Sequence, residues 1–236
     1  MTPTPRPATV FAWLVHGYTA SGAVLGFMAL LAVAGRDFRS AFLWLTAATI
    51  VDATDGWLAR RVRVADRAAA IDGAHLDDIV DYVTYVFVPA YLIYQAGLLP
   101  DTGGVAIAGA ILLASAYAFA RRDAKTSDHF FTGFPSYWNV VALYLYLGGL
   151  SARANAGVLL ALCVLVFVPT TYVYPSRTPV LRRTTLVLGA AWGAALLGMI
   201  LRLPDRSGFW TAASLMFPVY YTTLSAVLHR RRRAGP

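Results

Sequence analysis

Four aspartates between residues 52 and 81 have the spacing of a metal site. Asp52 and Asp55 are three residues apart, and Asp77 and Asp81 are four residues apart. On an α-helix each pair lies on one face, within roughly 60° of rotation. Four carboxylates at the ends of two facing helices repel one another unless a cation lies between them, and hard divalent cations prefer oxygen ligands of this kind. The spacing therefore predicts a divalent-metal site.

The residues beside the first pair suit a phosphate ligand. Gly56 follows Asp55 directly and removes a side chain where a bulky ligand would approach the metal. Arg60 lies just over one turn further on, and its planar guanidinium suits bidentate contact with phosphate oxygens. Structural salt bridges would be the simpler interpretation for a single Asp–Arg pair. For two helical pairs of acids we instead favour a pyrophosphate-binding site at the membrane–water boundary.

Composition excludes an ordinary soluble domain. The chain is 58% hydrophobic and 14% charged, and its mean hydropathy is +0.58. Carboxylates are costly in such surroundings, so acids that remain there are candidates for function. All 12 acidic residues are Asp, and the single cysteine, Cys163, lies within an apolar run as a small core residue. A lone cysteine rules out a disulfide within the chain.

Eight apolar runs predict an all-α fold, a polytopic membrane helical bundle with about eight transmembrane helices. Most runs match the ~20 residues that a helix needs to cross the hydrocarbon. We expect a single integral-membrane domain over residues 1–236, with the first run retained as a span. The fifth run is short, and Pro169 can kink the sixth. The runs are 10–34, 40–59, 79–99, 103–121, 136–150, 155–174, 184–201 and 208–228.

Charge predicts the orientation of the bundle. With both termini in the cytoplasm, 15 Lys and Arg residues fall inside and five fall outside. A bias of this size follows the positive-inside rule. It places the acids at the cytoplasmic face and makes the basic C-terminal run, His229 to Arg233, an anchor to lipid headgroups. We therefore expect a membrane protein whose site faces the cytoplasm.

The acidic pattern resembles the signature of the CDP-alcohol phosphotransferases, Asp-x2-Asp-Gly-x2-Ala-Arg followed by Gly-x3-Asp-x3-Asp. Members of this family are membrane enzymes that move a phosphatidyl or related group from a CDP-linked lipid to an alcohol and release CMP. Eight fixed residues in a stated order make the match specific. The matching positions are Asp52, Asp55, Gly56, Ala59, Arg60, Gly73, Asp77 and Asp81.

Further features resemble a bacterial subgroup of this family that makes phosphatidylcholine. Twelve residues separate Arg60 from Gly73, more than in most of the family. Residues 15–22 and 129–139 also look like that subgroup, as does the eight-span layout. The resemblance implies CDP-diacylglycerol and choline as substrates, membrane lipid as surroundings, Mn2+ or Mg2+ as cofactor, and a homodimer.

The resemblance also implies roles for single residues. Asp52, Asp55, Asp77 and Asp81 would be the metal ligands, and Asp81 would also take the proton of the choline hydroxyl. The pocket for the CDP-lipid would be lined by Gly56, Ala59, Arg60 and Gly73. Asp78 is about 100° around the helix from Asp77 and is left out, and Asp72 stays undecided.

Recognition of choline requires aromatic faces, because a quaternary ammonium has no hydrogen-bond donor. Tyr85 follows Asp81 by one turn on the same face, so we expect it to point at the acids, unlike Tyr82. Tyr137, Trp138 and Asn139 open the fifth run at the same depth. Each of these aromatics could instead be a core or interfacial residue.

Two alternatives remain at this point. The acceptor could be serine, glycerol 3-phosphate or an inositol phosphate, although a phosphorylated acceptor would need more basic residues than the loops provide. The chain could also be a cation-coupled transporter. A transporter would place acids or broken helices near the bilayer midplane, whereas these acids lie at span ends.

Overall fold

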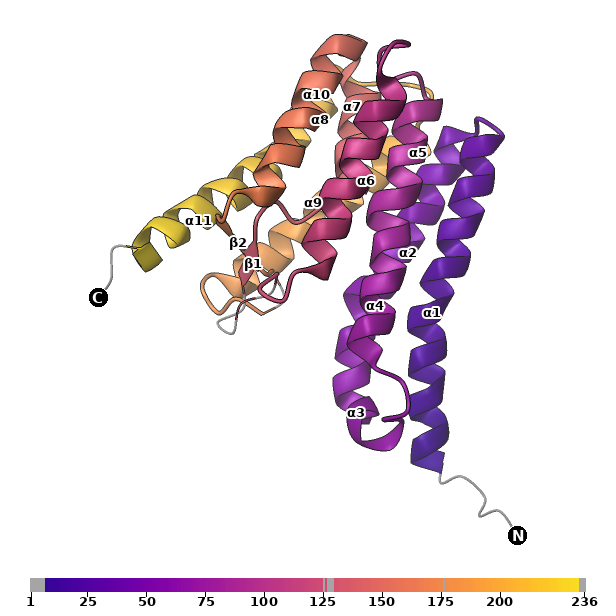
Figure 1. Cartoon of the computed structure of the whole chain (residues 1–236), viewed down its shortest axis with the longest axis vertical. Coiled ribbons are helices and arrows are strands. Elements are labelled where there is room, and N and C mark those ends of the chain that lie inside the picture. The colour runs from indigo at the N-terminus through magenta and orange to yellow at the C-terminus, as the bar shows by residue number, and fades with distance from the viewer. Residues whose placement is uncertain (1–6, 125, 127–129, 176, 234–236) are drawn as a thin grey trace.

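The computed structural model describes residues 7–124, 126, 130–175 and 177–233, and over these residues the chain is an all-α membrane bundle with one small two-stranded sheet (Figure 1). His129, Arg6 and Lys125, which enter the subgroup resemblance and the charge count, lie outside the described residues. The helices are α1 (Pro7–Ala34), α2 (Phe38–Val62), α3 (Val64–Arg67), α4 (Gly73–Asp81), a π-helical segment η1 (Tyr82–Phe87), α5 (Val88–Gln95), α6 (Gly104–Ala120), α7 (Trp138–Gly148), α8 (Ala152–Phe167), α9 (Arg182–Leu201), α10 (Gly208–Ser214) and α11 (Met216–Arg233).

Each of the eight apolar runs forms a helix or a continuous helical segment in the described part of the chain. The third run corresponds to α4, η1 and α5 joined end to end, and the last to α10 and α11. Among the described residues, three helical stretches are both long and apolar enough to cross a membrane, 9–34, 182–201 and 208–233. Large apolar side chains cover the outer surface, including Leu113, which is 75% exposed. Such a surface suits lipid as its solvent.

The third helix begins earlier than the apolar run predicts. We expected a polar connection over 60–78, but α2 extends to Val62 and α4 begins at Gly73. The side chain of Asp72 accepts hydrogen bonds from the backbone N–H groups of Ala74 and His75, at 3.0 and 3.2 Å. This N-cap satisfies donors that the first turn leaves open and starts the helix six residues before the hydrophobic stretch. The undecided Asp72 is therefore a capping residue.

The sixth run was predicted too long, because α8 ends at Phe167 and not at residue 174. Pro169 has no backbone N–H, and the residue before a proline avoids helical backbone angles. The chain then forms β2 (Thr171–Val173), which pairs antiparallel with β1 (Phe130–Thr132). Gly133 follows β1 with φ +81°, and a Cβ there would collide with the carbonyl oxygen of Val166. The two-stranded sheet is thus held against the end of α8.

Small residues bring α1 close to the third helix, as their helical spacing predicts. A Cβ added at Gly22 would lie 2.6 Å from Cγ1 of Val80, and one added at Gly26 would lie 3.0 Å from Cγ1 of Val83. Both glycines therefore allow a backbone approach that a larger residue would block. The main core continues from this contact through α2, α5, α6, α7 and α8, with Trp138, Leu92 and Ile111 fully buried.

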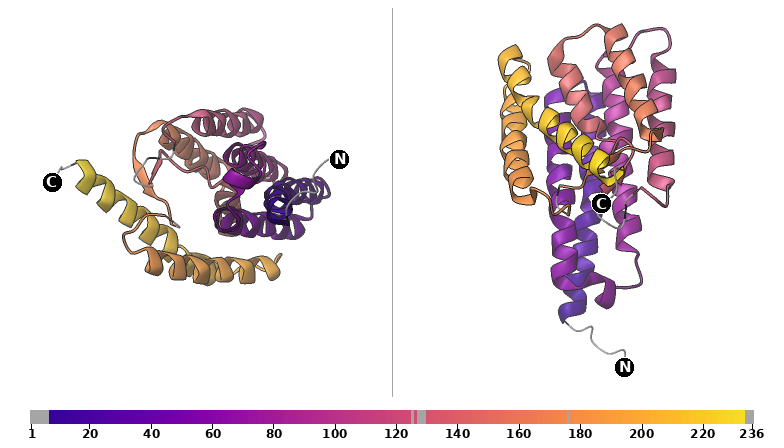
Figure 2. Two further views of the ribbon diagram at one scale, coloured as in Figure 1. Left: turned by 90° about the horizontal axis from the view of Figure 1, so that it is seen from below. Right: turned by 90° about the vertical axis from the view of Figure 1, so that its left-hand side faces the viewer.

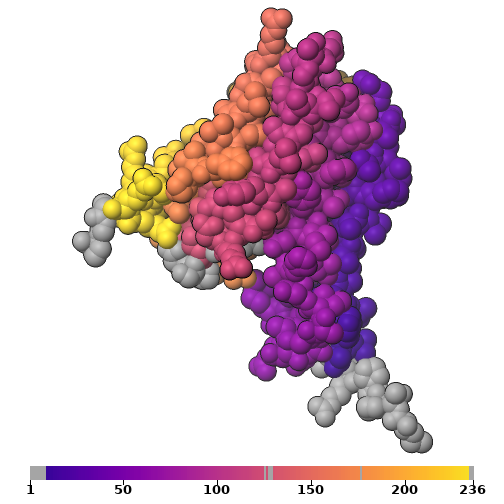
Figure 3. All heavy atoms as spheres, in the orientation of Figure 1, coloured from indigo at the N-terminus to yellow at the C-terminus, as the bar shows by residue number. Residues whose placement is uncertain are grey.

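The helices form two groups. Seen from below, α9 and α11 form an outer layer beside the ring made by the other helices (Figure 2). The lower parts of α1, α2 and α4 project beyond the rest of the molecule (Figure 3). The acidic residues come from α2 and α4, so the site belongs to this projecting group.

Candidate metal and substrate site

Three of the four predicted carboxylates converge from two helices. Asp52 and Asp55 come from the C-terminal half of α2, and Asp77 comes from α4. One carboxylate oxygen from each lies within 4.8 Å of the other two. Asp55 is only 6% exposed, whereas Asp52 and Asp77 are half-buried. Oxygen donors at this spacing, in a partly dry setting, fit a hard divalent cation.

Two hydroxyl groups orient these carboxylates. The Thr19 hydroxyl on α1 donates to Oδ2 of Asp55 at 2.7 Å, and the Tyr85 hydroxyl on η1 donates to Oδ2 of Asp52 at 2.6 Å. Partners of this kind fix the direction of a ligating side chain and are part of a metal site in most proteins. Helices α1 and η1 therefore support the acids that α2 presents.

Asp81 is the last residue of α4 and is not part of the group of three within the described residues. Its charge acts on the hydroxyls of Tyr85 and Tyr137, and so does the charge of Asp52. Asp81 therefore lies near these two tyrosines, as Asp52 does.

A π-helical turn sets the direction of Tyr85. In η1 the backbone widens, and Val88 N–H bonds to the carbonyl of Val83, five residues back. Pro89 explains this turn, because its ring would clash with the carbonyl of residue 85 in a regular α-helix and it has no N–H to donate. Tyr85 points at Asp52, whereas the Tyr82 hydroxyl donates to Leu112 O on α6 at 3.0 Å. The expected contrast between the two tyrosines is confirmed.

The glycines of the signature make room for side chains of this protein. A Cβ on Gly56 would lie 3.2 Å from a guanidinium nitrogen of Arg60, so the absent side chain leaves space for that arginine. A Cβ on Gly73 would lie 3.2 Å from Cε1 of His16. His16 is buried and contacts Ala68 O at 3.4 Å, which ties the connection before α4 to α1. Ala59 is half-buried on α2 between the acids and Arg60.

The predicted acceptor residues divide into two groups. The ring of Tyr137 lies 6.1 Å from that of Tyr85, centroid to centroid, and thus adjoins the acidic site. Trp138 is fully buried and donates to Ser115 on α6 at 2.7 Å. Asn139 donates to the Thr49 hydroxyl on α2 at 3.2 Å, one helical turn before Asp52. Trp138 therefore packs into the core, while Tyr137 and Asn139 lie on the side of α2.

Sequence reasoning missed two residues, Thr19 and Tyr221. The Tyr221 hydroxyl on α11 hydrogen bonds with that of Tyr137 and donates to Val173 O in β2 at 2.9 Å. Nothing in the local sequence around Tyr221 marks it, because its partners are more than 40 residues away. Thr19 lies inside the 15–22 stretch that resembles the bacterial subgroup, so a signal for it was present.

The fold and the site define a polytopic membrane protein with a buried acidic cluster near one end of its helices. No protein-family model matches the chain. The chain is 40% identical to a curated phosphatidylcholine synthase of Legionella pneumophila, over 95% of this chain and 92% of that protein. It is 36% identical to the phosphatidylcholine synthase of Pseudomonas aeruginosa over 87% and 88%, and 35% identical to that of Rhizobium johnstonii over 94% and 91%.

Identities of this size over nearly the whole length show that the chain belongs to the phosphatidylcholine synthase family. It is therefore a transferase of phospholipid biosynthesis. The resemblance of its acidic motif to the CDP-alcohol phosphotransferases agrees with this family.

Proposed function

We propose that this chain transfers the phosphatidyl group of CDP-diacylglycerol to choline and releases CMP. The observation that supports it most is the convergence of three carboxylates from α2 and α4 within 4.8 Å of one another, in a chain of this family. The acids come from the C-terminal half of α2 and from α4, and Arg60 follows them on α2. A cation site followed by an arginine favours a reaction on a phosphate-bearing lipid headgroup over a cation pathway across the bilayer.

Asp52, Asp55 and Asp77 are proposed as the residues that hold Mn2+ or Mg2+, with Asp81 contributing a further carboxylate. When bound, such an ion would neutralise the pyrophosphate and stabilise the charge that develops on the leaving CMP. Thr19 and Tyr85 hold two of the carboxylates in fixed directions. Arg60, exposed at the end of α2, would bind a pyrophosphate oxygen with its guanidinium, for which Gly56 leaves room.

Asp81 is proposed as the general base. Its carboxylate would accept the proton of the choline hydroxyl while the hydroxyl oxygen forms a bond to the phosphatidyl phosphorus. The bond from that phosphorus to the CMP oxygen then breaks, and CMP leaves with the electron pair. The position of Asp81 beside the tyrosines, outside the group of three, favours this assignment.

The faces of Tyr85 and Tyr137 are proposed to hold the trimethylammonium group, with Tyr221 fixing the Tyr137 ring from α11. A cation within about 6 Å of a ring centroid is attracted by the ring quadrupole. The carboxylates of Asp52 and Asp81 add negative charge on the same side. Asn139 would border this recess through its contact with Thr49, and Trp138 would support it from the core.

In the described part of the basic loop after α6, Arg121 is not free to bind the phosphate of a phosphorylated acceptor. Arg121 donates to Asp123 at 2.6 Å, and this bond holds the pKa of the Asp123 carboxyl below its usual value. The charge of Arg121 is therefore offset locally.

We also propose that the acidic site lies at the cytoplasmic face of the inner membrane with both termini inside, because basic residues gather at that end. A homodimer is proposed from the family resemblance, and the mass of the solubilised protein tests it.

The decisive experiment uses the purified full-length chain with CDP-diacylglycerol and a panel of labelled acceptors. Choline should give phosphatidylcholine in the presence of Mn2+ or Mg2+, and serine, glycerol 3-phosphate and inositol phosphate should give no product. Excess EDTA should abolish turnover, and added Mn2+ or Mg2+ should restore it. Full activity in EDTA would refute the metal assignment, and use of another acceptor in place of choline would refute the proposed substrate.

A further inference from the structure

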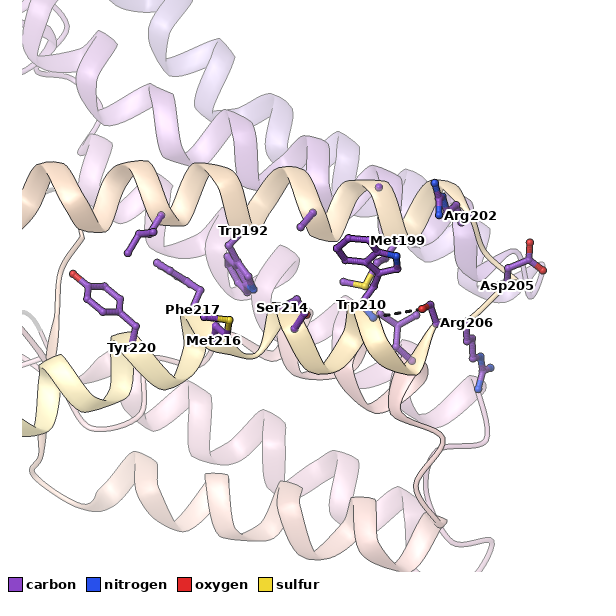
Figure 4. A pocket seen from close by; sticks show the side chains of 16 residues that line it. Trp192, Met199, Arg202, Asp205, Arg206, Trp210, Ser214, Met216, Phe217 and Tyr220 are labelled. Atoms are coloured by element: carbon purple, nitrogen blue, oxygen red, sulfur yellow. Dashed lines mark hydrogen bonds between the residues drawn. The ribbon is translucent and has the colours of Figure 1, made fainter.

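A cavity of about 800 Å³ lies between α9 and the α10–α11 pair (Figure 4). We call it the α9–α11 cavity. Its Arg206 lies over Tyr146, which packs on Phe38 at the start of α2, whereas the acids lie toward the other end of that helix. Helix α9 begins at the end of the bundle where β1 and β2 lie and runs to the end that holds the connections 35–37 and 96–103. The cavity follows α9 from Leu188 onward. Its volume falls within the range of small-molecule and lipid sites, roughly 300–1,000 Å³.

Polar groups inside the cavity are already bonded within the protein. The Tyr144 hydroxyl bonds to the hydroxyl of Ser214 at 2.9 Å and accepts from Nε1 of Trp192 at 2.9 Å. The Tyr220 hydroxyl bonds to that of Thr185 at 2.9 Å. Since these donors and acceptors have partners, the walls present hydrocarbon and aromatic surface to a ligand. The interior therefore suits an alkyl chain.

Aromatic and thioether side chains form the walls. Trp192 stacks on Phe217 with their ring centroids 4.9 Å apart, and Met199 lies nearby, against the hydroxyl of Thr211. Trp210, which is 55% exposed, borders the cavity toward the end where Arg202 and Arg206 lie. Flexible and flat side chains of this kind adapt to an acyl chain without a fixed polar pattern.

Charge gathers at one end of this cavity only. Arg202, Asp205 and Arg206 lie together at that end in Figure 4, while the other end is closed by Tyr220. Within the described residues neither arginine forms an ion pair. The Arg206 guanidinium lies over the Tyr146 ring, 4.5 Å from its centroid, and this contact holds it at the mouth. With one acid and two arginines, the mouth carries a net positive charge.

We propose that the α9–α11 cavity binds one acyl chain of an anionic glycerophospholipid, whose phosphate contacts Arg202 and Arg206. An apolar interior with a cationic mouth matches an amphiphile with a negative head. The substrate lipid is a poor occupant, because its pyrophosphate must reach the acids on α2 and α4 at the other end of the helices. The lipid is therefore a separate ligand, held in the opposite leaflet from the reaction.

Brominated lipids test this directly, since Trp192 and Trp210 border the cavity. The full-length chain is reconstituted in phosphatidylcholine vesicles that contain phosphatidylglycerol with brominated acyl chains, or phosphatidylcholine brominated in the same way at equal mole fraction. Phosphatidylglycerol should quench tryptophan fluorescence more strongly. Arg202→Gln and Arg206→Gln should each lower its relative affinity by about 5-fold, the factor expected when one basic contact to an anionic lipid is lost.

Matched variants decide the outcome. Arg153→Gln removes a charge at the same end of the bundle but away from the cavity, and the preference for phosphatidylglycerol should survive it. Trp192→Phe with Trp210→Phe should remove the difference between the two lipids. Equal quenching by both lipids in the wild type, or an Arg153→Gln effect as large as that of Arg202→Gln, would overturn the proposal. Quenching needs no turnover, so the result is independent of the proposed reaction.

Discussion

The acidic site and the mouth of the α9–α11 cavity lie at opposite ends of the same bundle, and the two sites are built in opposite ways. At the acidic site polar side chains converge, and each carboxylate of the first pair has a hydroxyl partner from another helix. In the cavity the polar groups bond to one another and leave an apolar interior, with charge at its mouth only. One region is organised to hold ions and the other to hold hydrocarbon.

The two regions therefore serve different purposes, the acidic site catalysis and the cavity the binding of a lipid chain. A site that binds phosphates and metal needs fixed, partly buried charge, and the closely packed helices α1, α2 and α4 provide it. A site for a lipid chain needs volume and adaptable walls, and the outer layer of α9 and α11 provides that. Variants at one end should therefore leave the measured property of the other end unchanged.

Asp81→Asn should have the largest effect. It removes the proposed proton acceptor but keeps the size of the side chain, so kcat should fall at least ~100-fold, the usual contribution of a general base. Binding of CDP-diacylglycerol should persist. In contrast, Asp52→Asn, Asp55→Asn and Asp77→Asn should regain part of their activity when metal is added in excess. Initial rates over a Mn2+ series measure both effects.

Asp78→Asn is the control for this series, because its side chain is about 100° around the helix from Asp77. It should keep a near wild-type rate. If Asp81→Asn also kept that rate, Asp81 is not the base. Selectivity for phosphatidylglycerol over phosphatidylcholine in the quenching assay should be the same in all these variants.

Tyr85→Leu should raise the KM for choline by about 2- to 30-fold and leave the KM for CDP-diacylglycerol little changed. A cation–π contact contributes roughly 0.5–2 kcal/mol, and ~1.4 kcal/mol corresponds to tenfold in KM. Tyr85→Phe separates the ring from the hydroxyl that contacts Asp52. It should keep the choline KM and raise only the metal requirement. An unchanged choline KM in Tyr85→Leu would remove this residue from the acceptor site.

Thr19→Val should weaken the apparent affinity for Mn2+ by about 10-fold, since loss of a partner that orients a metal ligand commonly has this cost. The substitution keeps the shape of the side chain and deletes the hydrogen bond to Asp55. Ser21→Ala is a fitting control, because the Ser21 hydroxyl donates only to Tyr18 O in the same helix. Equal metal requirements in the two variants would show that Thr19 has no role at the acidic site.

Asp37→Ala should have the smallest effect and none on catalysis. Asp37 caps α2 by accepting from Ser40 N–H at 3.0 Å, and loss of such a cap costs about 1 kcal/mol of stability. Hydrogen bonds with Ser40 lower the pKa of Asp37 in the folded chain. Its contribution should therefore be complete at neutral pH and be lost as the pH falls through this lowered pKa. Thermal unfolding in detergent at neutral and acidic pH measures it, with Asp37→Asn, which keeps the cap, as the comparison.

Much of the acidic site could be predicted from sequence because its information is local. Asp52 and Asp55, three residues apart, lie on one face of a helix, and so do Asp77 and Asp81, four residues apart. Helix geometry alone gives this result. The groups that support the site from distant segments do not follow from this local spacing. Thr19, marked only by the family resemblance of 15–22, reaches Asp55 through the crossing of α1, and Tyr221 reaches Tyr137 through the return of α11.

The helices were predictable from hydropathy, whereas their ends were not. Asp72 starts α4 ahead of the apolar run, and Pro169 ends α8 before the apolar run is complete. Both ends are decided by one residue whose effect hydropathy does not measure. The pairing of β1 with β2 joins segments about 40 residues apart, and three-residue strands have no alternation long enough to be recognised.

The π-helical turn η1 limits where the chain tolerates insertions and deletions. Its extra residue per turn sets the rotation between the acids of α4 and the buried face of α5, which includes Ala90, Leu92 and Ile93. Deletion of one residue from 82–87 would remove the wide turn that accommodates Pro89 and directs Tyr85. Tyr85 would then lose its hydrogen bond to Asp52. Insertions and deletions should therefore be excluded from this segment in functional variants, while a surface connection such as 96–103 can vary in length.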